Sequence, residues 1–400
     1  MTRPSPRRRV LLGAAGLAVL AAAGAALTAT GGGEPDAGAA QARARARVLA
    51  TAAPAPAPGP ARWSALTAGG EPMGVTADAA GVVVVSYGSV QSLDPADGSE
   101  RWRARIGRTP DIAPVRAAVD ADLVAVPTSS GVTALARADG ALRWTARFGP
   151  GLADAGITGP VALAQPAGGE PLVLGTNSGT LTAFDRGSGA TRWSVRFDGE
   201  IVTAPVVDGT AGVTVALWHV DGGEGRLRAV DLATGTVRWD VATLEKTAAP
   251  VAHGGVVLVS EGDNFSHARV RALDSATGAS RWETAVPKSF EWETEPAAAG
   301  DDYVTVDHFG TVTAFSVTTG TIRWQRSGDW ALIDTQVVIG ARSVAFHDFA
   351  GHQVVLDRAT GEVRSVTRAG PVTDEAVRDD LVVTAVNEPV ARRFEARPLP

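Results

Sequence analysis

The sequence that decides the fold is Leu273-Asp274-Ser275-Ala276-Thr277-Gly278-Ala279-Ser280-Arg281-Trp282. A short apolar run ends at an aspartate, a glycine follows, and a second segment leaves through Arg-Trp. An aspartate side chain can accept hydrogen bonds from the turn that follows it, and glycine adopts the positive φ angles that tight turns need. The stretch therefore predicts a β-hairpin whose second strand carries the tryptophan.

Copies of this hairpin recur along most of the chain. The arginine that precedes the tryptophan stands at residues 62, 101, 143, 192, 238, 281 and 323, and Arg364 occupies the same position in a copy without tryptophan. The spacings of 39 to 49 residues are typical of β-propeller blades, each of which holds four short strands. We therefore expect an all-β protein, with an eight-bladed β-propeller of four-stranded antiparallel blades over residues 62–400.

The two ends of the repeat region complement each other. Arg62-Trp63 precedes the first complete hairpin, whereas the segment after Arg364 has strand-like runs but no Arg-Trp pair. We expect residues 62–66 to form the outer strand of the last blade. Such a strand would close the ring non-covalently and leave no interior sheet edge unpaired.

The period-two alternation after each tryptophan predicts its environment. Trp144, Ala146 and Phe148 fall on one face of the strand, and the arginines that flank Trp144 fall on the other. We expect each arginine to pair with the aspartate seven residues earlier, as Arg281 with Asp274, although Ala136 and Ser316 replace that aspartate in two blades. The repeat tryptophans are predicted to be structural core residues, with a role as aromatic ligand platforms as the alternative: Trp63, Trp102, Trp144, Trp193, Trp239, Trp282 and Trp324.

The N-terminal segment has a different composition. Arg7-Arg8-Arg9 precedes an apolar run from Val10 to Thr30, so residues 1–30 are predicted to be a signal peptide or an N-terminal membrane anchor. The basic stretch is similar to the twin-arginine export motif, with ordinary secretion as the alternative. Residues 31–61 are rich in Ala, Pro and Arg and are predicted to form a disordered linker. The chain is therefore expected to be exported, and to be extracellular or membrane-anchored with the propeller outside the cytoplasm.

The composition excludes several classes of function. The chain has 400 residues, a net charge of −6 and no cysteine, and its basic N-terminal segment leaves the repeat region near −12. An acidic body argues against nucleic-acid partners, which usually require a basic surface. Without cysteine the chain forms no disulfide and has no thiolate nucleophile.

The unit of an apolar residue, Asp, two residues, Thr-Gly and then Trp resembles the repeat of the PQQ-like, or quinoprotein-like, β-propeller family over residues 62–400. That resemblance implies the propeller, but the family includes both dehydrogenases that hold PQQ and Ca²⁺ and BamB-like members that are not enzymes. Many of those dehydrogenases stack the quinone against adjacent cysteines, which this chain lacks, and no set of Glu, Asn and Asp stands out as Ca²⁺ ligands. The lipidated cysteine usual in BamB-like proteins is also absent.

Loops outside the repeat positions supply the candidate partner-binding residues. Trp330, and Trp292 with Glu291 and Glu293, lie in loops ahead of innermost strands, where an exposed tryptophan would suit a protein or glycan partner. A tryptophan that fills the central channel is the alternative. The loops that join second and third strands contribute His308, His347 and Asp348. These residues could bind a metal or act as a general base, and the alternative is a turn residue that forms only local hydrogen bonds.

We therefore expect an exported, non-catalytic binding or scaffold module at the cell envelope. Its expected partner is a protein or cell-envelope component, the propeller is expected to be monomeric, and no cofactor is expected. One alternative is a PQQ- and Ca²⁺-dependent oxidoreductase of reduced size, which would need Ca²⁺ ligands around the axis. Another is an extracellular carbohydrate-binding or sensor module, for which Trp292 and Trp330 would have to be exposed together on one rim.

Overall fold

The computed structural model contains only β-strands among the residues it describes. These residues run from 61 to 399, with gaps at 68–69, 79, 111–113, 149–157, 167, 178, 221–224, 264–267, 287–294, 308–309, 329, 331–335, 349–350, 369, 371, 379–380 and 388–391. Within this part of the chain, no helix has the length and apolar character needed to cross a bilayer. The signal or anchor predicted for residues 1–30, and all but the last residue of the linker predicted for residues 31–61, lie outside the described residues.

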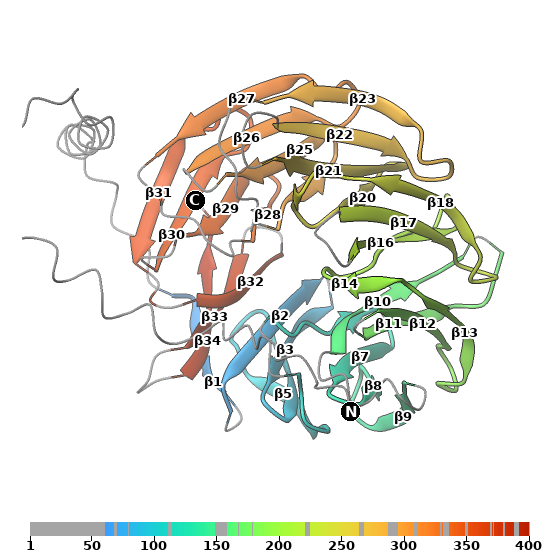
Figure 1. Cartoon of the computed structure of the whole chain (residues 1–400). Coiled ribbons are helices and arrows are strands. Elements are labelled where there is room, and N and C mark those ends of the chain that lie inside the picture. The colour runs from blue at the N-terminus through green and yellow to red at the C-terminus, as the bar shows by residue number, and fades with distance from the viewer. Residues whose placement is uncertain are drawn as a thin grey trace, which may run out of the picture. The chain divides into compact units, whose positions relative to one another are not determined.

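Eight antiparallel sheets follow one another around a central axis, and each sheet is one propeller blade (Figure 1). In the order from axis to rim, blade 1 contains β2 (Pro72–Asp78), β3 (Gly81–Ser86), β4 (Ser89–Leu93) and β5 (Glu100–Arg105). Blade 2 contains β6 (Ala118–Val119), β7 (Leu123–Thr128), β8 (Gly131–Ala136) and β9 (Leu142–Arg147). Blade 3 contains β10 (Thr158–Ala164), β11 (Leu172–Asn177), β12 (Thr180–Asp185) and β13 (Thr191–Arg196).

Blades 4 and 5 have an innermost strand in two pieces. Blade 4 contains β14 (Gly199–Ile201) with β15 (Val206–Asp208), β16 (Val213–Val220), β17 (Gly225–Asp231) and β18 (Val237–Ala242). Blade 5 contains β19 (Lys246–Thr247) with β20 (Val251–His253), β21 (Val256–Gly262), β22 (Ala268–Asp274) and β23 (Ser280–Ala285). Pro205 and Pro250 each stand directly before the second piece, and each interrupts the strand because proline has no N–H for the ladder.

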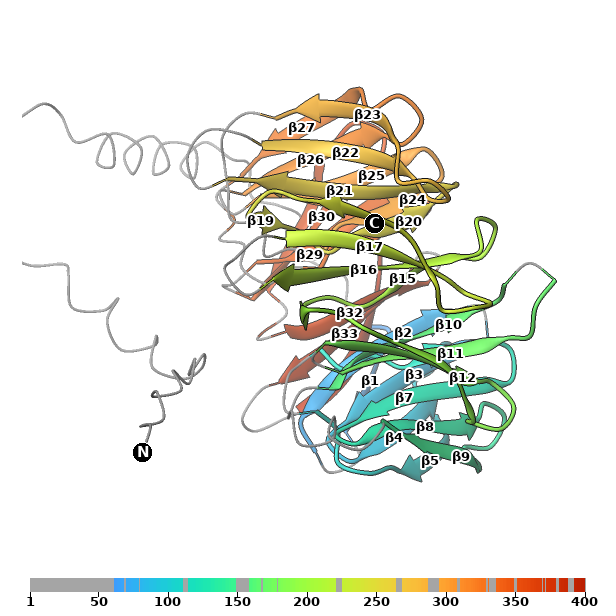
Figure 2. The ribbon, with the colours of Figure 1, turned by 45° about the vertical axis from the view of Figure 1, so that its right-hand side comes forward.

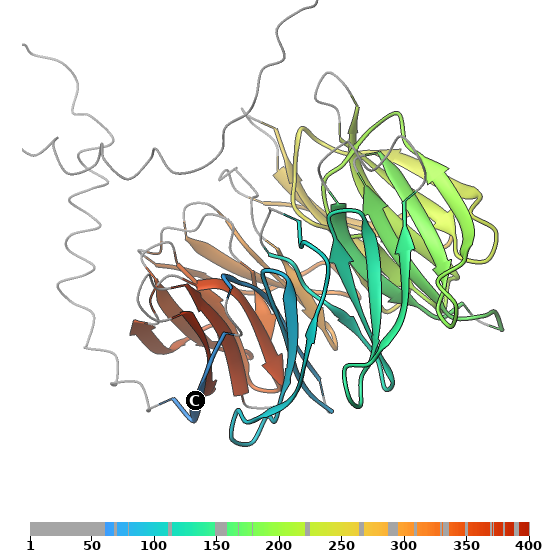
Figure 3. The same cartoon turned by 90° about the horizontal axis from the view of Figure 1, so that it is seen from below.

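The remaining blades complete the ring, and Figure 2 and Figure 3 give two further views of the sheets. Blade 6 contains β24 (Ala297–Ala299), β25 (Asp302–Val306), β26 (Thr311–Ser316) and β27 (Ile322–Ser327). Blade 7 contains β28 (Val338–Ile339), β29 (Ser343–His347), β30 (His352–Asp357) and β31 (Val363–Arg368). Blade 8 contains β32 (Val372–Arg378), β33 (Leu381–Asn387), β34 (Arg392–Pro398) and β1 (Trp63–Leu66).

The N-terminal strand closes the ring as the sequence predicted. Strand β1 pairs antiparallel with β34, in a register that runs from Trp63 opposite Ala396 to Leu66 opposite Arg393. The first and last described segments therefore share one sheet, and the expected eight-bladed propeller is confirmed.

The repeat tryptophans hold neighbouring blades together. Each indole Nε1 donates a hydrogen bond of 2.7–3.0 Å to a carbonyl in the outer hairpin of the next blade. Each ring also covers the turn glycine of that hairpin: Trp193, for example, covers Gly235, where φ is +73° and an added Cβ would lie 2.8 Å from the tryptophan Cγ. The predicted core role is confirmed, with Trp282 partly buried and the other six buried.

The interface between blades 7 and 8 lacks this contact. Ser365 follows Arg364 where the other blades have tryptophan. The third and outer strands of blade 8 come from opposite ends of the chain, so no hairpin turn joins them to receive an indole ring. Leu399 packs there instead, against Val338, Ala345, Val355 and Val382.

The predicted Asp–Arg pairs form wherever the aspartate is present. Salt bridges join residues seven positions apart in five blades, as at 2.6 Å between Asp274 Oδ2 and Arg281 Nη2. Where Ser316 replaces the aspartate, Arg323 pairs with Asp301 and Asp302 from the preceding turn. These pairs are largely exposed and contribute little to stability, whereas the apolar clusters between blades form the core.

Candidate functional site at the propeller axis

The candidate site lies where innermost strands begin beside the axis. Arg116 lies two residues before β6 of blade 2, and Glu295 and Gln336 lie at the same distance before the innermost strands of blades 6 and 7. Asp374 lies in β32, the innermost strand of blade 8. Innermost strands surround the axis, so side chains from blades that are distant in sequence meet here.

Arg116 joins all of these groups through its guanidinium. Its Nε and Nη2 donate hydrogen bonds of 2.9 and 2.6 Å to Oδ1 of Asp374. Its Nη1 lies 2.6 Å from Oε2 of Glu295, and its Nη2 lies 2.9 Å from the amide oxygen of Gln336. One arginine therefore links blade 2 to blades 6, 7 and 8, and we call these four residues the axial cluster.

The backbone around the axial cluster is also tightly connected. The second carboxylate oxygen of Asp374 accepts a hydrogen bond of 2.7 Å from the N–H of Val75 in blade 1. Glu295 and Gln336 form a parallel bridge between blades 6 and 7. At Gly74 an added Cβ would lie 2.1 Å from the carbonyl oxygen of Val115, so only glycine allows this approach of blades 1 and 2.

Burial shapes the electrostatics of the cluster. The side chain of Asp374 is fully buried, and burial raises the pKa of Asp374 to about 6, against the opposing effects of Arg116 and the Val75 N–H. Burial alone would lower the pKa of Arg116, but the charges of Asp374 and Glu295 raise it above its usual value. Arg116 therefore stays charged and holds two carboxylates in place.

A second buried pair lies beside the axial cluster on the same strand. Glu375 follows Asp374, and its Oε2 lies 2.8 Å from Nδ1 of His347 in blade 7. Both side chains are almost completely buried. The predicted site residue His347 therefore contacts a carboxylate of the neighbouring blade across the interface that lacks a tryptophan.

Asp348 holds its own turn together. Its Oδ1 accepts a hydrogen bond of 2.7 Å from the N–H of His352, and its Oδ2 lies 2.9 Å from Nδ1 of the same histidine. Asp307 occupies the equivalent turn in blade 6 and accepts a hydrogen bond of 2.8 Å from the N–H of Thr311. The same turn geometry in two blades favours the local structural role for Asp348 over a general base.

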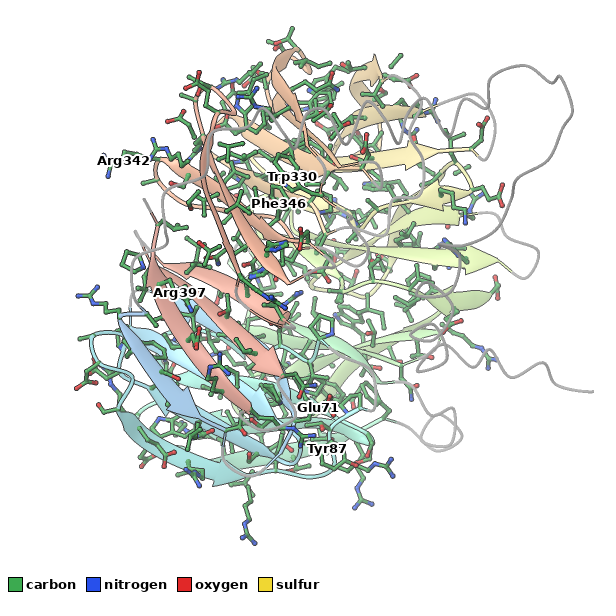
Figure 4. All side chains as sticks on the ribbon, turned by 90° about the vertical axis from the view of Figure 1, so that its left-hand side faces the viewer. Glu71, Tyr87, Trp330, Arg342, Phe346 and Arg397 are labelled. Carbon is green, nitrogen blue, oxygen red and sulfur yellow. The ribbon has the colours of Figure 1, made fainter. Side chains whose placement is uncertain are left out.

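Trp330 is partly buried rather than freely exposed. Its ring stands edge-on to Phe346, with ring centroids 5.2 Å apart, and packs against the apolar cluster between blades 6 and 7 (Figure 4). Trp330 therefore packs between two blades, and its predicted role in partner binding remains a prediction. The other candidates, Trp292, Glu291, Glu293 and His308, lie outside the described residues.

The residues at the axis do not fit a Ca²⁺-bound quinone. Ca²⁺ requires six to eight oxygen ligands, and across the described segments no group of three or more His, Cys, Asp or Glu side chains is arranged to hold a metal ion. The two carboxylates of the axial cluster, Asp374 and Glu295, are already bound to Arg116. The absence of a cofactor remains a prediction, and the cluster itself gives no support for one.

Sequence reasoning missed the residues that meet at the axis. The residues concerned do not belong to the hairpin repeat: Arg116, Glu295, Gln336, Asp374 and Glu375. The one signal available was an arginine directly after an Ala-Pro-Val segment, at the entry to an innermost strand.

Comparisons with known proteins agree with this architecture. A family model described as outer membrane protein assembly factor BamB matches residues 53–148 and 128–364. No curated protein matches the sequence. Among solved structures, BamB from Moraxella catarrhalis is 19% identical with a TM-score of 0.60, over 81% of this chain and 93% of that one.

Two other solved structures show how widely the fold is shared. A quinohemoprotein alcohol dehydrogenase from Pseudomonas putida HK5 is 13% identical with a TM-score of 0.58, over 85% of this chain and 76% of that one. The C-terminal WD40 domain of Sif2 is 9% identical with a TM-score of 0.62, over 85% and 98% of the two chains. At these identities the likeness shows the fold alone.

Proposed function

Because the chain belongs to the PQQ-like β-propeller family whose model is described as outer membrane protein assembly factor BamB, we propose that it is an exported, non-catalytic binding or scaffold module at the cell envelope. The proposed partner is a protein or another cell-envelope component. The Moraxella catarrhalis BamB structure supports this class of role through its fold.

The position of Arg116 at the axis is the observation that supports a non-catalytic role. A guanidinium placed 2.6 Å from both Asp374 Oδ1 and Glu295 Oε2 supplies the positive charge that these carboxylates require. The same bonds fix the innermost strands of four blades relative to one another. A rigid ring whose central carboxylates are held by an arginine suits a scaffold, since a scaffold needs fixed surfaces rather than reactive groups.

The alternative from the enzyme class is a PQQ- and Ca²⁺-dependent oxidoreductase. The similar quinohemoprotein alcohol dehydrogenase keeps this alternative open at the level of fold. Its test is reconstitution of the purified chain with PQQ and Ca²⁺, followed by a dye-linked assay with alcohols and sugars. We expect no turnover above the apoprotein background, and turnover that needs both additions and disappears with a chelator would contradict the proposal.

Export is tested with the N-terminal segment itself. Residues 1–60 fused to a reporter that is active only outside the cytoplasm should give reporter activity in the native host. A matched fusion in which Arg7, Arg8 and Arg9 are replaced by lysine keeps the charge but removes the twin-arginine pattern. Loss of activity only in the lysine fusion indicates twin-arginine export, equal activity indicates ordinary secretion, and an inactive parent fusion contradicts export.

A further inference from the structure

Every outer strand has an equivalent position near its end, and the type of residue at that position differs from blade to blade. It is the third residue after the tryptophan position, and we call it the rim position. In blades 1 to 3 it pairs with the first residue of the third strand, as Arg105 with Ser89, Arg147 with Gly131 and Arg196 with Thr180. Equal register places the three side chains at the same height on three neighbouring blades.

The identity of the residue at the rim position divides the ring in two. Blades 7, 8, 1, 2 and 3 follow one another around the perimeter (Figure 1), and we call their residues the rim arc: Arg368, Leu66, Arg105, Arg147 and Arg196. Blades 4, 5 and 6 have small residues there: Ala242, Ala285 and Ser327. At the rim position itself, arginine therefore occurs on blades 7, 1, 2 and 3 and not on blades 4 to 6.

The rim-arc arginines are exposed and do not take part in the repeat salt bridges. All four are exposed, and none forms an ion pair with another residue in the described part of the chain. The arginines directly before the tryptophan position, by contrast, pair with aspartates on both sides of the ring, on blades 1, 3 and 7 as well as on blades 4 to 6. The guanidiniums of the rim arc thus remain available to an external anion.

Leu66 is the apolar residue of the rim arc. It is 72% exposed, the largest value among the exposed large apolar side chains that the structure describes. Its register partner is Arg393, and exposed Arg392 lies next to Arg393. Leu66 therefore lies beside two arginines, of which Arg393 is paired with Glu395.

The charge of the chain is also divided between the two halves of the ring. Residues 62–199 contain 12 arginines against 13 acidic residues, whereas residues 200–400 contain 18 basic against 28 acidic residues. Many acids of the first half lie in turns and are paired, as Asp78 with Arg137 and Asp120 with Arg186. The rim of blades 1 to 3 therefore meets less repulsion from an anionic surface than the opposite side.

We propose that the rim arc docks the propeller on an anionic phospholipid bilayer. Guanidinium groups bind phosphate oxygens in a bidentate geometry, and an exposed leucine among arginines is typical of proteins that lie at a membrane surface. The arginines are spread one per blade instead of converging in a pocket, which suits an extended array of phosphates better than an acidic peptide. Which membrane the propeller would meet depends on the proposed export, whereas its binding to anionic lipid does not.

The test uses residues 53–400, which form one compact unit containing all eight blades. Flotation with phosphatidylcholine vesicles, with and without phosphatidylglycerol, measures binding at low and at physiological salt. We expect binding only to the anionic vesicles, with weakening as salt rises. Replacing Arg105, Arg147 and Arg196 by glutamine should reduce partitioning by about 100-fold, at about fivefold for each arginine near an anionic surface.

A matched variant separates the rim arc from net charge. Arg238→Gln, Arg281→Gln and Arg323→Gln remove the same charge from paired arginines on blades 4 to 6, and we expect partitioning within about twofold of the parent. Leu66→Asn should weaken binding without changing its salt dependence. Melting curves confirm that each variant is folded before binding is compared.

Three results would overturn the proposal. The first is absence of binding to phosphatidylglycerol vesicles at low salt, including the case in which soluble polyglutamate binds and identifies an acidic protein as the partner class. The second is equal binding to neutral and anionic vesicles. The third is an equal loss in the two triple variants. None of these results bears on PQQ binding, so this proposal and the proposed function fail separately.

Discussion

The contact between Trp193 and Gly235 allows the account of blade docking to be tested with a single methyl group. We consider Gly235→Ala, in which φ at residue 235 is +73° and the new Cβ would meet Cγ of Trp193 at 2.8 Å. An alanine in the left-handed region costs about 1–2 kcal/mol. Displacing a buried ring from a close-packed interface costs about 1–3 kcal/mol more, so the sum is about 2–5 kcal/mol.

The same blade supplies the control. Gly212 lies in the turn before β16, has a φ of +67°, and an added Cβ there would meet nothing within 4 Å. Gly212→Ala therefore carries only the backbone cost of about 1–2 kcal/mol. The difference between the two variants isolates the contact between blades 3 and 4.

Urea unfolding of residues 53–400, followed by circular dichroism, gives the free energy of unfolding for both variants. We expect Gly235→Ala to be less stable than Gly212→Ala by at least about 1 kcal/mol. Equal stability of the two variants would refute the inter-blade tryptophan contact as a source of stability.

Four further predictions follow from the salt bridges, the axis and the blade 7–8 interface. Arg281→Gln removes the exposed pair with Asp274 and leaves the turn hydrogen bonds of Asp274 in place, so it should lower the unfolding free energy by less than about 1 kcal/mol in a urea titration; a larger loss would contradict the view of these pairs as minor. The pKa of Asp374 is raised to about 6, so the folded state binds its proton more tightly than the unfolded state, and the contribution of this side chain to stability should fall by roughly 2 kcal/mol as pH rises from 4 to 6. Asp374→Asn should abolish that change in melting curves, and an unchanged pH profile would count against it. Arg116→Met leaves a buried carboxylate without its cation and should cost about 3–5 kcal/mol at pH 7 but clearly less at pH 5, whereas an equal loss at both pH values would contradict the charge pairing. Ser365→Trp adds a ring where blade 8 has no outer hairpin turn and should destabilise by about 1–3 kcal/mol, and a gain in stability would show that a receiving site exists.

The architecture could be predicted from the sequence because the blades repeat the same short hairpin pattern. The Asp–Gly turn, the Arg-Trp exit and the alternation after each tryptophan are all encoded within about ten residues, and their count and spacing give eight blades. Even the closing strand was predictable, since Trp63 lacks a hairpin of its own. The receiving partner of each tryptophan was not predicted, because it lies 32–42 residues away on the next blade.

The axial cluster could not be predicted in the same way. Arg116 and Asp374 are 258 residues apart, belong to no repeat, and meet only because the ring closes. The interruption at Pro205 depended on a short strand ahead of it that carries no pattern of its own. Trp330 was recognised as lying outside the repeat, but its packing on Phe346 depends on a neighbouring strand of blade 7.

The most direct test of the central claim is an equilibrium titration of residues 53–400 with PQQ, with and without Ca²⁺, followed by melting temperature and quinone absorbance. A ligand present at 100 times its dissociation constant stabilises the folded state by about 2.7 kcal/mol, which a melting curve detects readily. Because Arg116 already occupies the carboxylates at the axis, we predict no saturable shift with either addition. A saturable, Ca²⁺-dependent rise in melting temperature would contradict the account of a propeller without a cofactor.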